Sequence, residues 1–420
     1  MPNPSPLPQP ARGSSFEVLL VFLRLGCTSF GGPIAHLGYF QKEIVERRRW
    51  CTQDRLAELI AIAQSLPGPA SSQVGFALGI LRAGWLGGLA AWIGFTLPSA
   101  LLMLAFAYGH SFLAAGVGLK LLHGLQLVAV AVVAQAILAM KKTLAPDRLR
   151  MSFAIAATGI TLFAPPRLAT LIAIAAGAIA GLLFCRSQQN DTSEHPALPL
   201  PKAAGAAAAI IFFALLLLPP LLARYVPTPA ITLFSAFYRS GALVFGGGHV
   251  VLPVLENAVV TPGWVTQQTF LAGYGAAQAL PGPLFTFAAF LGASIVRAPS
   301  VFNTRTFSIP TGLHLQPLLY GLLGLIGLFT PGLLAMAAVL PFWAELRENF
   351  YIRAALKGIN ASVVGVLIAA LFQPLWITTV HASSDFWIVL LAFTLLTFWK
   401  IQPWKVVACV AAASVLANSL

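Results

Sequence analysis

Two arginines, Arg24 and Arg239, each stand inside a long apolar run of the sequence. A guanidinium group within a membrane is costly to bury and usually faces a partner or a transport pathway. Its paired N–H donors match the oxygens of tetrahedral anions. The pattern therefore favours contact with an anionic substrate. Two other interpretations stay open, namely snorkelling to the lipid headgroups and pairing with an acid such as Glu17.

The surroundings of these arginines are repeated about 215 residues apart along the chain. Each copy has an arginine, a glycine pair after a phenylalanine, and a Pro-Gly-Pro segment preceded by a glutamine. The first copy contains Arg24, Phe30, Gly31, Gly32, Gln64, Pro67, Gly68 and Pro69, and the second contains Arg239, Phe245, Gly246, Gly247, Gln278, Pro281, Gly282 and Pro283. Such doubled Gly and Pro breaks inside apolar stretches are typical of secondary transporters that bind substrate between two repeats.

The Pro-Gly-Pro segments predict helix breaks, because proline lacks a backbone donor and glycine permits a sharp turn. A broken helix inside a bilayer is tolerated only where protein or a water-filled cavity surrounds it. The residues that follow the first break, including Ser71, would begin a new helix whose free N–H groups can bind an anion. Two inverted halves would aim two such helix starts at one point near the membrane midplane. A simple kink in each helix is the alternative.

The remaining polar residues near these motifs each have two interpretations. The glycine pairs permit either close approach of the backbone to a ligand or tight packing of helices. Gln126 and Asn360 occupy matching positions in apolar segments, where they line a pathway or bond across helices. His36 follows the first glycine pair, and a local hydrogen bond is favoured there over a role in proton coupling.

The composition identifies a polytopic membrane protein. Hydrophobic residues make up 58% of the chain, charged residues only 9%, and the mean hydropathy is +0.84, whereas soluble proteins have about 25% charged residues. The net charge of +13 is explained by basic cytoplasmic loops rather than by nucleic-acid binding. Asp and Glu together number 12, and none is clearly buried in an apolar segment. This scarcity favours an anion over a cation as substrate.

The apolar segments divide the chain into two repeats around a linker. Residues 1–15 form a polar, Pro-rich tail that we expect to be disordered. The first repeat covers residues 16–185, the linker with one extra apolar segment covers 186–229, and the second repeat covers 230–420. The predicted segments are 16–40, 57–80, 84–109, 119–141, 151–164 and 167–184, then 203–223, and then 230–256, 270–296, 318–344, 357–377, 386–399 and 403–418. A single odd segment between the repeats indicates that they have opposite orientations in the membrane.

The charges of the loops support this inversion. Basic loops lie on the cytoplasmic side, and both Glu43–Arg55 and Lys141–Arg150 are basic. They share a side only if residues 57–80 form a re-entrant hairpin. The same reasoning makes 270–296 re-entrant, with the loop Asn257–Thr269, which has no Lys or Arg, outside and the basic loop Glu345–Lys357 inside. Counting the crossings in the same way allows segments 16–40 and 230–256 to be re-entrant too. Ordinary membrane-spanning helices are the alternative for these two segments.

Motifs of other function classes are missing from the sequence. It has no Walker A segment, no GxSxG and no HExxH, and its four cysteines are scattered without a CxxC pair. Transport driven by ATP hydrolysis in this chain is therefore disfavoured. A membrane enzyme acting on lipid-linked substrates is disfavoured as well, because no metal or carboxylate cluster stands out. We predict no enzyme activity, no cofactor and no metal.

Across almost its whole length, from about residue 16 to 418, the chain resembles the chromate ion transporter family in its long two-domain form. The segments that carry the resemblance are Ser29–Pro33, Gln64–Pro69, Phe95–Ser99, Val244–Pro253, Gln278–Pro283 and Lys357–Ala361. The resemblance implies an all-α, multi-pass exporter in the bacterial inner membrane that removes chromate and confers resistance. Sulfate is the expected competitor because it shares the shape and charge of chromate. A sulfate or other oxyanion transporter is the alternative, and a homodimer is left open.

Overall fold

The computed structural model describes residues 13–109, 117–185, 201–226, 228–245, 248–295 and 315–417. Most of the predicted tail, the linker residues 186–200, and Gly246 and Gly247 lie outside the described residues. Within the described part every regular element is helical. Five of these helices are long and apolar enough to cross a membrane. The predicted all-α polytopic architecture is therefore confirmed.

The first repeat contains helices broken at the predicted places. Its helices are α1 (Ser15–Thr28), α2 (Gly32–Phe40), α3 (Gln53–Ser65), α4 (Ala70–Gly109), α5 (Val117–Leu144), α6 (Arg148–Phe163) and α7 (Pro166–Phe184). A π-helical turn, Gln41–Arg47, continues α2. The extra segment between the repeats is the helix α8 (Lys202–Tyr225).

The second repeat follows the same order. Its helices are α9 (Pro229–Leu243), α10 (Val251–Val259), α11 (Gln267–Ala279), α12 (Phe287–Ala293), α13 (Leu315–Val339), α14 (Trp343–Glu348), α15 (Phe350–Ala370), α16 (Ile377–Thr379), α17 (Ser383–Thr397) and α18 (Pro403–Ala417). Short 3₁₀ turns cover Gly248–Val250, Leu284–Thr286 and Leu340–Phe342, and a π-helical turn covers Leu371–Trp376. The matching order lets each break of one repeat be compared with its counterpart.

Ion pairs of Glu17 hold three points of the first repeat together at one end of the molecule. Glu17, in the first turn of α1, pairs with Arg48 after α2 at 3.6 Å and with Arg82 at 3.1 Å. Arg82 precedes the reversal of α4, where Gly84 has a φ of +68°. The start of α1, the end of the α2 segment and the top of α4 thus meet at one end of the molecule. Residues 16–40 and 57–80 therefore both return to the end of the molecule at which they begin, which is the path that the loop charges predicted.

The two repeats are joined by a reciprocal pair of backbone hydrogen bonds. The N–H of Gly68 donates to the carbonyl of Val244 at 2.7 Å, and the N–H of Gly282 donates to the carbonyl of Ser29 at 2.8 Å. Gly68 and Gly282 are the central residues of the two Pro-Gly-Pro segments, while Ser29 and Val244 each precede the phenylalanine of a glycine break. Such an exchange of partners is what a two-fold relation between inverted repeats produces.

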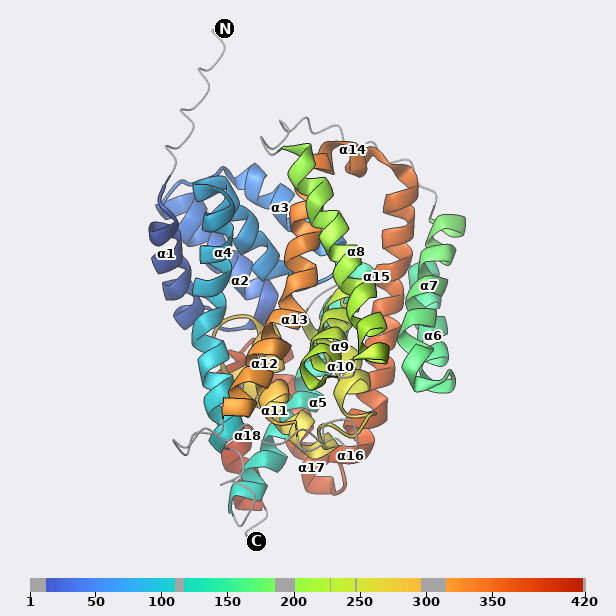
Figure 1. Ribbon diagram of the computed structural model, residues 1–420. Coiled ribbons are helices and arrows are strands. Elements are labelled where there is room, and N and C mark those ends of the chain that lie inside the picture. Colours follow the sequence, from blue (N-terminus) through green and yellow to red (C-terminus); the bar gives the residue numbers. More distant parts are fainter. Residues whose placement is uncertain are drawn as a thin grey trace, which may run out of the picture.

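The long helices follow the same relation. In Figure 1, α4 descends from the upper end while α13 ascends toward α14, so the equivalent spans run in opposite directions. The last two helices of each repeat pack on a helix of the other repeat. α6 and α7 pack on α15, and α17 and α18 pack on α5. The core therefore forms both between the repeats and inside each one, where α1 packs on α4 and α9 packs on α13.

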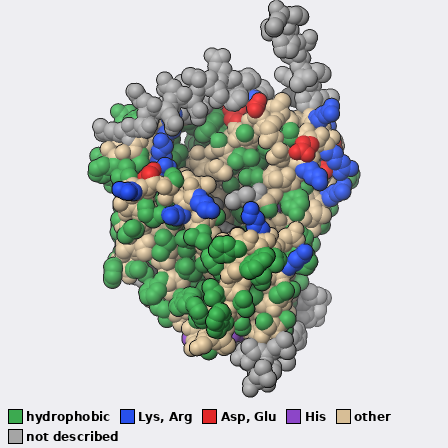
Figure 2. Space-filling model, turned by 180° about the vertical axis from the view of Figure 1, so that it is seen from behind, with side chains coloured by type: hydrophobic (Ala, Val, Ile, Leu, Met, Phe, Trp, Pro, Cys, Tyr) green, Lys and Arg blue, Asp and Glu red, His purple; other side chains and the backbone are tan. Residues whose placement is uncertain are grey.

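The charged side chains separate the two ends of the molecule. On the face shown in Figure 2, Lys and Arg gather in the upper half, whereas the lower half is largely hydrophobic. The upper end carries α3 and α14 in Figure 1. The loop between α10 and α11, which has no Lys or Arg, lies toward the lower end. We call the upper end the basic end.

Candidate functional site

The first glycine break is shaped by backbone that only glycine adopts easily. Gly31 and Gly32 have φ values of +100° and +79°, and Pro33 follows in the first turn of α2. Side chains with a Cβ are strained at such positive φ values. The break therefore turns the chain sharply between α1 and α2 and leaves the first amides of α2 without side-chain caps.

The Pro-Gly-Pro breaks also require glycine, and each is packed against the opposite half. Gly68 and Gly282 have φ values of +116° and +92°. A Cβ on Gly68 would lie 2.6 Å from Cα of Gly332, and a Cβ on Gly282 would lie 2.8 Å from Oγ of Ser99. A larger residue would need movement of the backbone at Gly68 and of the Ser99 side chain at Gly282, and it would be strained by the positive φ at both positions. The breaks are built features of the fold and not simple kinks.

A cavity of about 440 Å³ lies where the glycine break of the first repeat meets the Pro-Gly-Pro break of the second. Phe30–Gly32 line one wall, and Leu280, Gly282 and Leu284 line the next. The polar side chains that complete the lining are Tyr39, Gln135, Gln278, Thr397, Lys400 and Gln402. Both breaks lie at the contact between the two repeats, so the cavity lies on the boundary between them. We call it the central cavity.

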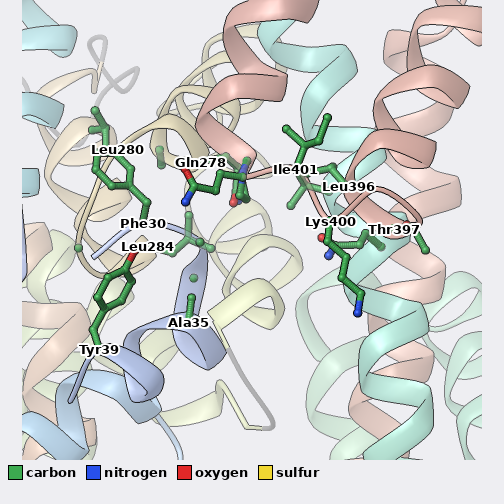
Figure 3. Close-up of a pocket in the computed structure, with 18 residues that line it drawn as sticks. Phe30, Ala35, Tyr39, Gln278, Leu280, Leu284, Leu396, Thr397, Lys400 and Ile401 are labelled. Atoms are coloured by element: carbon green, nitrogen blue, oxygen red, sulfur yellow. The ribbon is translucent and has the colours of Figure 1, made fainter. Parts of the chain in front are cut away.

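The two repeated glutamines have different surroundings. Gln278, on α11, lines the central cavity beside the hydroxyl of Tyr274, and its buried Nε2 makes no hydrogen bond of regular geometry in the described structure. Figure 3 shows it on the wall opposite Lys400 and Thr397, with the hydroxyl end of Tyr39 directed toward the same space. Gln64, its counterpart on α3, is exposed and does not line this cavity. Only one glutamine of the pair is placed to bind a ligand there.

Lys400 is a cavity residue that the sequence analysis missed. It lies in the turn between α17 and α18 and adopts a φ of +52°, which is uncommon for a residue with a long side chain. Each of these helices has 15 residues, or about 22 Å at 1.5 Å per residue, too short to cross a core of about 30 Å. The short lengths were the available signal that these two helices need not span the membrane.

The helix start after Pro69 has a structural role. Ser71, in the first turn of α4, bonds through Oγ to Nδ1 of His36 at 3.2 Å. Gln73 donates from Nε2 to the carbonyls of Pro67 and Gly332, each at 2.9 Å. These side chains are 2% exposed or less and do not line the central cavity. The expectation of two equivalent helix starts facing one anion is therefore not met. The local hydrogen bond predicted for His36 is present.

The break after Pro281 and Pro283 continues differently from its counterpart. A 3₁₀ turn, Leu284–Thr286, follows Pro283 before α12 begins at Phe287. Thr286 donates from its hydroxyl to the carbonyl of Pro283 at 2.9 Å, which closes this turn. The part of the second break that lines the central cavity is the segment around Gly282, rather than the start of a regular α-helix.

Arg24 lies in a vestibule next to the central cavity. The vestibule encloses about 570 Å³, and Tyr39 lines both spaces. Glu43 in the vestibule is held by Arg47 and Arg48. Burial would raise the pKa of Glu43, but these hydrogen bonds outweigh burial and lower it. Glu43 is therefore ionised and neutralised locally, while Arg24 has no ion-pair partner among the described residues.

Arg239 is separated from Arg24. It lines an apolar groove beside α8, together with Arg224, Pro67 and Phe245. The structure thus does not bring Arg24 and Arg239 into one cavity. The reason is that each Pro-Gly-Pro break contacts the glycine break of the other repeat. The two contacts form two different spaces, the central cavity and the groove beside α8.

The matched pair Gln126 and Asn360 lies outside the central cavity. Gln126 donates from Nε2 to the carbonyl of Gln268 at 3.2 Å, a bond between α5 and α11. Asn360, half-buried on α15, has a buried Oδ1 without a partner in the described structure. Bonding across helices therefore accounts for Gln126. Among the described residues, no group of three or more His, Cys, Asp or Glu could hold a metal.

Comparison with known proteins points to a single family. The family model described as Chromate transporter matches residues 16–182 and 231–415. A chromate transport protein of Pseudomonas aeruginosa is 29% identical over 86% of this chain and 82% of its own length. A probable chromate transport protein of Synechococcus elongatus is 27% identical over 90% and 88%. A chromate transport protein of Cupriavidus metallidurans is 28% identical over 67% and 68%. No solved structure matches the chain.

Proposed function

This chain belongs to the chromate transporter family, and on that premise we propose that it exports chromate from the cytoplasm across the inner membrane of a bacterium and so confers resistance. Chromate is a tetrahedral dianion, and it needs hydrogen-bond donors and positive charge to replace its water. The observation that carries the proposal is the central cavity, which gathers such groups at the contact between two inverted repeats.

We assign the binding of the anion to three kinds of group in this cavity. The unpartnered Nε2 of Gln278 donates a hydrogen bond. The first amides of α2, exposed by the turn at Gly31 and Gly32, contribute further donors and the positive end of a helix dipole. Lys400 supplies a full positive charge from the opposite wall. Gly282 lets the backbone of the second break approach the ligand closely.

The vestibule supplies the route of entry. Arg24, Lys42 and Arg47 line it together with Glu43 and Glu46, and the excess of cations raises the local concentration of an anionic substrate. Tyr39 borders both vestibule and cavity, so an anion captured by Arg24 reaches Gln278 by passing this ring. We take the basic end as cytoplasmic, because Lys and Arg accumulate in cytoplasmic loops. The route then runs from the cytoplasm to the membrane midplane.

The membrane potential favours movement in this direction. Moving one charge across the membrane is worth about 2.3 kcal/mol per 100 mV. A dianion leaving a cell that is negative inside therefore gains roughly 4.6 kcal/mol at 100 mV. We propose that this gradient is sufficient to drive export.

Flux measurements in proteoliposomes test the proposal. The purified chain is reconstituted, and chromate uptake is measured while a potassium-diffusion potential and a pH gradient are imposed separately. We expect uptake to follow the potential, and sulfate to compete better than phosphate or molybdate. Flux equal to that of protein-free liposomes would reject the transport function. Faster saturable flux of sulfate than of chromate would instead identify a sulfate transporter built on the same site.

A further inference from the structure

The helix α8 leaves a groove on the surface of the second repeat. α8 lies over α9 and α13 (Figure 1). Its upper end is fixed by an ion pair between Lys202 and Glu345. Its middle is fixed where the hydroxyl of Tyr238 donates to the carbonyl of Phe212 at 2.9 Å. Beyond these attachments the helix leaves a groove of about 890 Å³.

The walls of the groove are almost entirely apolar. They come from α8, α9 and α13, with Leu171 of α7 and the break residues Pro67 and Phe245. On α8, Phe213, Leu217 and Leu221 line the groove while remaining 58%, 59% and 48% exposed. Because α8 is a candidate membrane span, these side chains face the acyl region of the bilayer. The groove is therefore open to lipid.

Two arginines interrupt this apolar surface. Arg224, in the last turn of α8, and Arg239, on α9, both line the groove and are both exposed. Neither has an ion-pair partner among the described residues, and no acidic side chain lines the groove. A guanidinium group beside hydrocarbon is costly unless an anion or water compensates it. The groove thus offers space for an apolar chain, and its two arginines have no negatively charged group beside them.

We propose that this groove binds an anionic phospholipid. An acyl chain lies along the leucines and phenylalanines of α8, and the guanidinium groups of Arg224 and Arg239 donate to the oxygens of the phosphate headgroup. Arginine binds phosphate through paired, charge-assisted hydrogen bonds. Basic pockets between membrane helices recognise anionic lipid headgroups in the same way. The transported dianion fits this groove poorly, because its lining offers no polar side chain apart from the two arginines.

The lipid site and the central cavity are distinct, and each can be tested without the other. Purified protein in mild detergent is titrated with phosphatidylglycerol or phosphatidylcholine, and bound lipid is counted by native mass spectrometry. We expect one retained phosphatidylglycerol that phosphatidylcholine does not displace. Equal retention of both lipids, or displacement of the lipid by inorganic phosphate alone, would overturn the proposal. Chromate is not part of this measurement.

Variants assign the site to the groove. The double variant Arg224→Gln/Arg239→Gln removes both cations, and we expect phosphatidylglycerol to bind at least about tenfold more weakly, as for the loss of one charge-assisted hydrogen bond or more. Leu217→Trp fills the groove at an exposed position and should lower retention without removing charge. Arg148→Gln, at the exposed start of α6, is the matched control and should bind as the parent does. Unchanged binding by the double variant would reject the site.

Discussion

The different surroundings of the two repeated glutamines lead to a sharp test of the central cavity. Gln64 and Gln278 occupy the same place in the repeated motif, and sequence alone treats them as equivalent. Gln278 lines the cavity with an unpartnered Nε2, whereas Gln64 is exposed on α3. Each can be truncated to alanine in the same helical position, before the same Pro-Gly-Pro segment. Gln64→Ala is therefore a matched control for Gln278→Ala.

The expected loss follows from one hydrogen bond. A hydrogen bond to a charged group contributes roughly 1.5–3 kcal/mol, which corresponds to about a 10- to 150-fold change in affinity. Gln278→Ala should therefore raise the KM for chromate by at least about tenfold. Gln278 also lies beside the hydroxyl of the buried Tyr274, so the stability of Gln278→Ala is measured together with its KM. Gln64→Ala should leave KM within about twofold of the parent, as expected for an exposed residue.

A third variant separates geometry from charge. Gln278→Glu keeps the size of the side chain but adds a negative charge beside a bound dianion. Like charges about 4 Å apart repel by roughly 4 kcal/mol per unit pair at an effective dielectric constant of 20. Transport by Gln278→Glu should therefore be weaker than by Gln278→Ala.

The assay is initial chromate uptake into proteoliposomes over a range of concentrations, with protein in each preparation quantified. Thermal unfolding of each variant, followed by a thiol-reactive dye or tryptophan emission, checks that it is folded. Equal KM changes for Gln64→Ala and Gln278→Ala would refute the placement of the substrate in the central cavity. The same conclusion would follow if Gln278→Glu transported chromate as well as the parent does.

Three further predictions concern other parts of the route. Lys400→Gln should raise the KM for chromate by roughly tenfold, and unchanged KM in the same uptake assay would exclude contact with the anion. Arg24→Gln should raise the KM for chromate by less than about fivefold, because exposed charges interact weakly. It should also reduce the dependence of uptake on ionic strength. An unchanged salt dependence would argue against capture of the anion in the vestibule. Gly282→Ala should destabilise the protein by roughly 1–3 kcal/mol, because its Cβ meets Ser99. Gly263→Ala, also at positive φ but with open space around it, should lose less stability. Equal melting temperatures of the two variants would contradict the packing described for the break.

The helix breaks could be predicted because their causes are local. Proline removes a donor and glycine permits positive φ wherever they occur in a helix. The observed values at Gly31, Gly68 and Gly282 follow from that chemistry. The return of these segments to one end could be predicted as well. The basic residues of the loops are visible in the sequence, and they indicate on which side of the membrane each loop lies. Glu17, with its bonds to Arg48 and Arg82, shows how the returning segments are held at one end.

The composition of the site could not be predicted, because it depends on which breaks meet. Motif order places Arg24 near Gly31 and Arg239 near the second glycine pair, but it does not say that Gly68 bonds to Val244 of the opposite repeat. Lys400 stands between two apolar segments, where a lysine is normally interpreted as interfacial. Only the packing of α17 and α18 on α5 brings it to the central cavity. Both errors of omission arise from contacts between residues far apart in sequence.

The inverted repeats generate two related spaces, and divergence between the repeats decides which one binds the substrate. The mate of the central cavity lies where Pro67 meets Phe245, and that space is part of the apolar groove beside α8. Gln135 of the central cavity corresponds to Ala369 when the repeats are aligned on Gln126 and Asn360. A dianion binds only where donors replace its lost water, so we expect the polar space, and not its apolar mate, to bind chromate. One polar site beside the axis of a nearly symmetric scaffold would let the repeats exchange conformations around the ligand while a single anion is carried in each cycle.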